Sequence, residues 1–323
     1  MIDLVITPLF YLALLGLLLI FIMALLSPLE TLNWWAGWSH EADKEIDLTP
    51  RPDQPPAQKA THYAVYLTAI GGVSAKDISS RERHFLNDLQ DQLPHLALIH
   101  DVFPFSVTNN PLNGERQLSW LWQKIHNSRM KKSGLILSGL IFVRNLLQVA
   151  VSGDPRYGPM YNVGVAKEIG ESLLRQGYVP GSGIPISVMG WSGGGQIAIG
   201  TARYLHEAFE APIYVISIGG VMADDPGILY VEHLYHLNGT KDKFPKVGEI
   251  LYPGRWPFLK YTAWNQAKRN GKMSVIVPGP MVHTGRHDYF DHKATLPNGQ
   301  SYLDKTVEVI NGIILDIDAH GTE

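Results

Sequence analysis

Residues 186–198 read ISVMGWSGGGQIA and place an apolar run, a glycine-rich turn and a helical pattern one after another. The run ISVM contains β-branched residues and is short enough to be one buried strand. After the glycines, Ile197, Thr201 and Leu205 repeat at the spacing of one helix face. This order predicts a strand that turns sharply into a helix.

The turn contains Gly190-Trp191-Ser192-Gly193-Gly194, which fits the pattern G-x-S-x-G. In a strand-to-helix turn of this kind the serine has a strained backbone, and small residues two positions before and after it avoid collisions. The serine oxygen then stands exposed at the carboxyl end of the sheet, so Ser192 is the predicted nucleophile. Because a helix start leaves backbone N–H groups free, Gly193 is the predicted oxyanion donor.

A dinucleotide site is the alternative for the same turn, because Gly193, Gly195 and Ala198 also fit G-x-G-x-x-A. Such a site normally uses the first strand and helix of its domain and has an acidic residue at the end of the next strand. Residues 217–220 contain no acidic residue. The pattern therefore favours the nucleophile, and we expect no cofactor.

Strands and helical patterns alternate over residues 61–323, which predicts a parallel sheet covered by helices. Ser79 and Glu82 form a capping-box pattern before one of these helices. The expected fold class is α/β, with a doubly wound and mostly parallel sheet. Its six predicted strands lie at residues 62–70, 96–100, 186–189, 213–218, 234–237 and 274–277.

Residues 105–160 are too many for a simple connection between a strand and a helix, so they are predicted to form a helical insertion. Its centre, residues 135–151, is strongly apolar. Arg144, Asn145 and Gln148 make a membrane span there costly. We expect a helix that is either buried or covers the face onto which Ser192 opens, as a lid.

The N-terminal segment, residues 4–26, has no charged residue and is long enough to cross the roughly 30 Å hydrocarbon core of a bilayer. It is predicted to be an uncleaved transmembrane helix, because a signal peptide would have a basic start and a shorter apolar run. Trp34, Trp35 and Trp38 suit the headgroup region, so residues 1–40 form the predicted anchor. The expected orientation places the globular part outside the cytoplasm. Residues 41–60 are a proline-rich linker.

Composition limits the chemistry that this chain can perform. The formal net charge of −3 is too balanced for a nucleic-acid binder, and nucleic acid is not an expected partner. Because the chain has no cysteine, it has no thiolate nucleophile and no cysteine-ligated metal. Composition leaves the oligomeric state undetermined.

With the turn around Ser192 in place, the chain resembles the α/β-hydrolase superfamily, whose nucleophile, acid and histidine follow one another along the sequence. The resemblance implies an acid two strands after the nucleophile. Asn238-Gly239-Thr240-Lys241-Asp242 looks like the acid turn of this superfamily, which makes Asp242 the first candidate. Asp224 and Asp225 follow the intervening strand and are the alternatives.

The same resemblance implies a histidine in the loop after the last strand. His283 lies there at a suitable distance and is the first candidate, while His287, four residues later, is the second. A second oxyanion donor is expected in the loop after the first strand, at Gly72 or Val73. His283, His287, Asp288, Asp291 and His292 also suggest a metal site, but the HExxH glutamate is absent and we expect no metal.

Taken together, these patterns predict a membrane-anchored serine hydrolase with the triad Ser192, His283 and Asp242. Its expected substrate is a carboxylic ester or thioester, and an acyl or lipid-like molecule fits the apolar insertion and the predicted anchor. The alternative is a catalytically silent interaction module with the same fold, tethered to the membrane.

Overall fold

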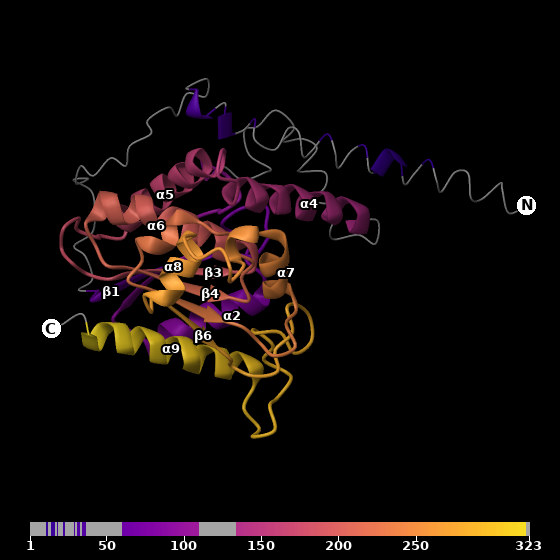
Figure 1. Cartoon of the computed structure of the whole chain (residues 1–323). Coiled ribbons are helices and arrows are strands. Elements are labelled where there is room, and N and C mark those ends of the chain that lie inside the picture. The colour runs from indigo at the N-terminus through magenta and orange to yellow at the C-terminus, as the bar shows by residue number, and fades with distance from the viewer. Residues whose placement is uncertain are drawn as a thin grey trace, which may run out of the picture.

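The fold is a single six-stranded parallel sheet between two layers of helices in the computed structural model (Figure 1). The structure describes residues 60–109 and 134–320, together with residues 11, 14–16, 18, 22, 29, 31, 32 and 34–36. The strand order is β2-β1-β3-β4-β5-β6. The strands are β1 His62–Leu67, β2 Leu96–Ile99, β3 Ile186–Trp191, β4 Ile213–Ile218, β5 His233–Leu237 and β6 Met273–Ile276.

The predicted α/β fold class is confirmed, and all six predicted strands form. The central strands β1, β3 and β4 are buried on both sheet faces, as a parallel sheet requires, whereas the edge strand β6 keeps Ser274 and Val275 exposed. The first strand ends at Leu67, before the predicted end at Ile70, because residues 70–71 already form a turn. The register places Gly190 of β3 between Leu67 of β1 and Ser217 of β4.

Helices cover the two faces of the sheet unequally. One face packs against α4 Gly134–Ser152, α5 Gly158–Arg175, α6 Gly193–Phe209 and α8 Ala263–Arg269. The other packs against α2 Ser80–Gln92 and α9 Tyr302–His320. Figure 1 shows these two layers on opposite sides of the strands. The remaining elements, η1 Pro226–Leu229, α7 Phe244–Leu251 and η2 Pro253–Arg255, belong to the connections after β4 and β5.

Local signals explain where several helices begin. The predicted capping box of α2 is present, because the Ser79 side chain accepts from the Glu82 amide and Glu82 accepts from the Ser79 amide. Helix α5 begins at Gly158 and has a proline in its first turn.

Helix α4 lies within the predicted insertion, where residues 110–133 are outside the described residues. The predicted transmembrane helix and linker also lie largely outside them and stay predictions. Within the described part of the chain, no helix combines the length and apolarity needed to span a bilayer. Trp34 is 2% exposed and belongs to the core cluster, whereas its neighbour Trp35 is 40% exposed.

Candidate active site

The turn between β3 and α6 holds Ser192 in a strained conformation, with φ 55° and ψ −118°. Glycines make this turn possible. A Cβ atom on Gly190 would lie 2.3 Å from the Gly194 carbonyl oxygen, and one on Gly194 would lie 2.5 Å from the Leu67 carbonyl oxygen. The G-x-S-x-G spacing is therefore a steric requirement of the close approach of α6 to β1 and β3.

Ser192 begins a chain of hydrogen bonds through two other buried side chains. Its Oγ lies 2.8 Å from Nε2 of His283. The other ring nitrogen of His283, Nδ1, lies 3.0 Å from Oδ2 and 3.2 Å from Oδ1 of Asp242. Serine, imidazole and carboxylate thus occur in the order that lets an imidazole accept the serine proton while a carboxylate stabilises the resulting cation.

Sheet topology brings these three side chains together from distant parts of the sequence. Ser192 follows β3, Asp242 lies in the turn after β5, and His283 lies in the loop after β6. Because β3, β4, β5 and β6 are parallel neighbours, the loops after them meet at one edge of the sheet.

The first residue of α7 fixes both the acid and the base. The backbone amide of Phe244 donates to Oδ1 of Asp242 at 2.9 Å. Its ring stacks on the His283 imidazole, with centroids 4.2 Å apart and planes inclined by 21°. Phe244 is half-exposed, so the imidazole is covered on this side by a ring that also reaches the surface.

The alternative acids are engaged elsewhere in the connection after β4. Asp225 accepts from the Gly227 amide at 2.8 Å and from Gln196 at 3.2 Å, and Asp224 accepts from the Trp264 amide at 2.7 Å. Burial raises the pKa of Asp225 to about 6. Both carboxylates therefore organise η1 and α8, and the structure places Asp242 beside His283 instead.

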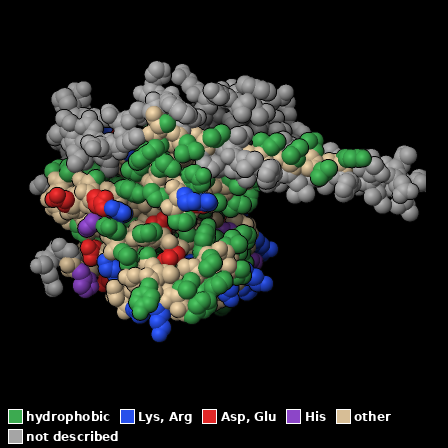
Figure 2. All heavy atoms as spheres, turned by 45° about the horizontal axis from the view of Figure 1, so that its top comes forward, with side chains coloured by type: hydrophobic (Ala, Val, Ile, Leu, Met, Phe, Trp, Pro, Cys, Tyr) green, Lys and Arg blue, Asp and Glu red, His purple; other side chains and the backbone are tan. Residues whose placement is uncertain are grey.

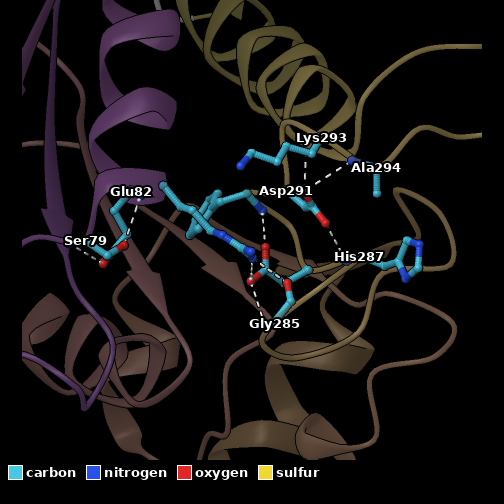
Figure 3. A network of polar contacts seen from close by, with 10 residues as sticks. Ser79, Glu82, Gly285, His287, Asp291, Lys293 and Ala294 are labelled. Carbon is cyan, nitrogen blue, oxygen red and sulfur yellow. Dashed lines mark hydrogen bonds and ion pairs between the residues drawn. The ribbon is translucent and has the colours of Figure 1, made fainter. Parts of the chain in front are cut away.

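The ring of the second candidate histidine, His287, packs against Tyr302, and the hydrogen bond to Ser192 comes from His283. The φ of 71° at His287 turns the chain, the His287 amide donates to Asp291 at 2.7 Å, and the centroids of the His287 and Tyr302 rings lie 5.3 Å apart. In Figure 3 the His287 ring projects out of the polar network that its backbone joins.

That network ties the histidine loop to α2. Arg81 of α2 donates to the Gly285 carbonyl and, at 2.7 Å, to Asp288, and Asp291 accepts from the amides of Lys293 and Ala294 (Figure 3). The acidic residues of the suggested metal cluster thus accept from backbone and arginine donors. Among the described residues, no group of three His, Asp or Glu side chains is arranged to hold a metal ion.

The expected oxyanion donors belong to two different segments, the start of α6 and the loop after β1. Gly193 is the first residue of α6, where an amide has no partner within the helix. Gly72 and Val73 donate within their own loop, to the Ala69 carbonyl at 3.4 Å and to Asp77 at 3.3 Å. The long Gly72 bond is weak, and an oxyanion would have to compete with it.

Tyr289 is a site residue that no sequence pattern indicated. It is fully buried, donates its hydroxyl to Oδ2 of Asp242 at 2.9 Å and accepts from the Gly239 amide at 2.8 Å. Burial and the adjacent carboxylate raise its pKa well above the ordinary value. The phenol thus stays a neutral donor that holds Asp242 in the orientation facing His283.

Replacing Tyr289 by phenylalanine is expected to lower kcat about tenfold with KM unchanged, because a hydrogen bond to a charged group is removed. Steady-state ester kinetics measure both constants. Tyr66→Phe is the matched control, since Tyr66 is also buried and donates to a carboxylate, that of Glu82 at 3.0 Å, outside this site. An equal loss of kcat in both variants would show that Tyr289 has no specific role.

Helix α4 holds the loop that follows β1 in place through Asn145, one of the polar residues that would make a membrane span costly. Asn145 is fully buried and donates to the carbonyls of Ile70 at 2.9 Å and Gly72 at 2.8 Å. Arg144 donates to Asn145 at 3.0 Å and to the Phe105 carbonyl. The predicted oxyanion loop is therefore positioned by α4.

We expect Asn145→Ala to lower kcat about tenfold or more, because two buried carbonyls lose their donor and the loop facing Ser192 loosens. Asn162→Ala is the control. Asn162 of α5 is similarly buried, accepts from the Ser152 hydroxyl at 2.7 Å and packs against Gly200 of α6. Urea unfolding and ester kinetics together should show a stability loss in both variants and a kcat loss in Asn145→Ala alone. A kcat loss shared by both would remove Asn145 from the site.

His236 lies under the site and responds to acid. Its Nδ1 is 3.2 Å from Ser217 Oγ, and burial, with a smaller contribution from Arg255, lowers its pKa to about 4. The unfolded chain has a histidine pKa of about 6.5 and binds the proton more readily. The stability that neutral His236 contributes is therefore complete above pH ~6.5 and is lost as the pH falls toward 4.

Urea unfolding of the protein and of His236→Gln across this pH range tests the assignment. Asp225 acts in the opposite direction, because its raised pKa makes its contribution decline as the pH rises through about 6. The difference between the two proteins isolates His236, and we expect the variant to lose less stability on acidification. Identical pH dependence would contradict the assignment.

A cavity of about 400 Å³ lies between the C-terminal end of α4, α6 and η1. Its lining includes Asp154, Arg203, Tyr204 and Tyr252, and none of Ser192, Asp242 or His283. The cavity is therefore separate from the hydrogen-bond chain.

No known family model matches this chain, and no curated protein matches its sequence. Among solved structures it is similar to a dienelactone hydrolase-like promiscuous phosphotriesterase from metagenomic libraries, with 12% identity, a TM-score of 0.43, and coverage of 83% of this chain and 89% of that one. It is also similar to a dienelactone hydrolase from Anabaena variabilis, with 15% identity, a TM-score of 0.39, and coverage of 81% and 88%.

These identities and TM-scores are low, and the chemistry of the site rests on its own geometry. The fold and the site define an α/β protein with a Ser-His-Asp hydrogen-bond chain at the carboxyl end of a parallel sheet.

Proposed function

We propose that this chain is a serine hydrolase of the α/β-hydrolase class that cleaves a carboxylic ester or thioester. The observation that carries the proposal is the connection of Ser192 Oγ to His283 and of His283 to Asp242, at 2.8 Å and 3.0 Å, on a strained turn. Such a connected chain favours an enzyme over a silent interaction module, because each member has the partner that catalysis requires.

In the first half-reaction, Ser192 Oγ attacks the acyl carbon while its proton passes to Nε2 of His283. The carbonyl oxygen becomes an oxyanion, for which the Gly193 amide is the nearest helix-terminal donor. Asp242 stabilises the imidazolium. Collapse of the tetrahedral intermediate breaks the bond to the alkoxide or thiolate, which takes the proton from His283 and leaves an acyl group on Ser192.

In the second half-reaction, a water molecule gives its proton to His283 and attacks the acyl carbon. The carboxylic acid leaves and the proton returns to Ser192 Oγ, which restores the starting state. The two half-reactions together consume one ester or thioester and one water molecule.

Apolar side chains close to the Ser192 turn support an acyl or lipid-like substrate. A Cβ atom placed on Gly193 would lie 2.7 Å from both the Ile70 and the Val149 side chains, which shows how closely apolar groups from the β1 loop and α4 approach the turn. Phe244 adds an aromatic ring beside His283. We propose that the acyl chain is held among these three side chains and that residues 4–26 keep the enzyme at a membrane.

A panel of p-nitrophenyl esters with acyl chains from acetyl to palmitoyl tests the reaction and its substrate class, using the detergent-solubilised full chain. We expect hydrolysis of the panel, with kcat/KM rising with chain length. Absence of turnover on every ester, with the folded protein intact, would overturn the hydrolase proposal. Turnover without a chain-length preference would overturn only the lipid-like substrate.

A further inference from the structure

Helix α7 presents its apolar residues to solvent, the reverse of an ordinary surface helix. Phe244, Val247 and Leu251 follow one another at helical spacing and all are exposed. The buried positions of this helix are instead Pro245 and Gly248. An exposed apolar stripe of this kind marks a surface that binds a partner.

The loop after η2, joined to α7 by the Trp256 ring N–H that donates to the Glu249 carbonyl at 2.9 Å, also carries exposed apolar side chains. Ile250 at the end of α7 is 72% exposed, and the loop side chains Phe258 and Tyr261 are 70% and 90% exposed. We name the surface formed by Phe244, Val247, Ile250, Leu251, Phe258 and Tyr261 the α7 face. In Figure 2, apolar side chains of the described residues gather in patches on the surface. Lysine and arginine side chains lie at the edges of these patches.

Positive charge surrounds the α7 face. Lys241, Lys243, Lys246 and Lys260 are all exposed, and within the described residues none of them forms an ion pair. Between residues 241 and 269 the only acidic residues are Asp242, buried against His283, and Glu249, which lies 3.8 Å from Arg255. This segment is thus strongly cationic, although the formal net charge of the whole chain is −3.

We propose that the α7 face rests on the surface of an anionic lipid bilayer. Exposed aromatic and aliphatic side chains bordered by lysines are the combination with which surface segments bind anionic membranes, the rings entering the interface and the cations contacting headgroups. The uncharged segment at residues 4–26 indicates the same environment from an independent part of the sequence.

Charge argues against a second copy of the chain as the occupant. A twofold contact through the α7 face would bring the same lysines of both copies together without acidic partners, and such like-charge contacts are unfavourable.

The α7 face lies next to the candidate active site. Phe244 belongs to the face, stacks on His283 and donates its amide to Asp242. A bilayer in contact with α7 would therefore lie beside Ser192 and His283. A lipid-like substrate could then pass from the membrane to the site without crossing bulk water.

The absence of cysteine from the chain permits a direct test by single-cysteine labelling. Phe258→Cys carries an environment-sensitive fluorophore on the α7 face. Val179→Cys is the matched control, because Val179 is 61% exposed and lies before β3, at the opposite end of the sheet. Both full-length proteins are reconstituted into phosphatidylcholine vesicles with and without phosphatidylserine, and iodide quenching is measured. The measurement is independent of catalysis, since it can be repeated in Ser192→Ala.

We expect the label at residue 258 to shift to the blue and to lose most of its iodide quenching in vesicles that contain phosphatidylserine, while the label at residue 179 stays quenched. Equal quenching at the two positions would overturn the proposal. So would shielding at residue 258 that appears without vesicles and grows with protein concentration, because it would identify a second copy as the occupant.

A charge variant separates attraction to anionic lipid from burial of apolar side chains alone. Each lysine near an anionic surface is worth about a fivefold change in partitioning, so Lys243→Gln, Lys246→Gln and Lys260→Gln together should weaken the contact about a hundredfold. Unchanged shielding in this triple variant would refute the choice of an anionic surface.

Discussion

Replacing Ser192 by alanine is expected to lower kcat for ester hydrolysis by about 10⁴-fold or more, to the level that binding and oxyanion stabilisation sustain alone. The variant loses the oxygen that forms the covalent bond to the acyl group. It keeps the fold, because the Ser192 side chain makes no cap bond to α6 and its described hydrogen bond is the one to His283. Single-turnover and steady-state ester assays measure the loss.

Ser187→Ala is the control for this experiment. Ser187 lies near the start of β3, the strand that precedes Ser192, is fully buried, and bonds to His62 at 2.8 Å. Its loss should lower stability and leave kcat nearly unchanged. If Ser192→Ala retained more than a small fraction of the activity, another group would have to be the nucleophile.

Replacing Asp242 by asparagine is expected to lower kcat by about 10⁴-fold at neutral pH, because an amide can hold the imidazole in the wrong tautomer and cannot stabilise its cation. Tyr289 and the Phe244 amide both donate to this carboxylate, so the substituted amide also places an NH₂ group opposite one of these donors. Thermal unfolding checks that the variant is folded.

The same substitution at Asp225 provides a matched control. Asp225 is the alternative acid in the sequence, and its carboxylate accepts from Gly227 and Gln196. Asp225→Asn should change stability while kcat stays within a few-fold of the parent. A loss of activity at residue 225 as large as that at residue 242 would reverse the assignment of the acid.

The six strands were predictable because each is a short, mainly apolar run between polar connections, and the central strands β1, β3 and β4 are in addition buried on both faces. The turn at Ser192 was predictable for a steric reason, since only glycine fits at Gly190 and Gly194. The G-x-S-x-G pattern follows directly from this local steric constraint, so the turn can be identified from the sequence.

Contacts between remote segments left no such pattern. Asn145 binds carbonyls that precede it by more than seventy residues, and Tyr289 reaches Asp242 across the β5 and β6 connections. No local sequence pattern around Asn145 or Tyr289 indicates these partners. The choice between His283 and His287 also depended on the path of the loop, because the positive φ of His287 directs its ring toward Tyr302.

Arg144 shows how one correct inference was incomplete. Its charge argued against a membrane span, and the structure adds that it is 9% exposed and donates to the Phe105 carbonyl and to Asn145. Two polar residues, Arg144 and Asn145, in an otherwise apolar helix indicate that α4 makes specific hydrogen bonds. Their partners could be identified only from the folded chain.

The most direct test of the central claim is to treat the full chain with a fluorophosphonate and to map the adduct by peptide mass spectrometry. Our account predicts one adduct, on the Ser192 oxygen, that fails to form in Ser192→Ala and forms far more slowly in His283→Ala. An adduct on a different residue, or equal labelling of Ser192→Ala and the parent, would contradict it.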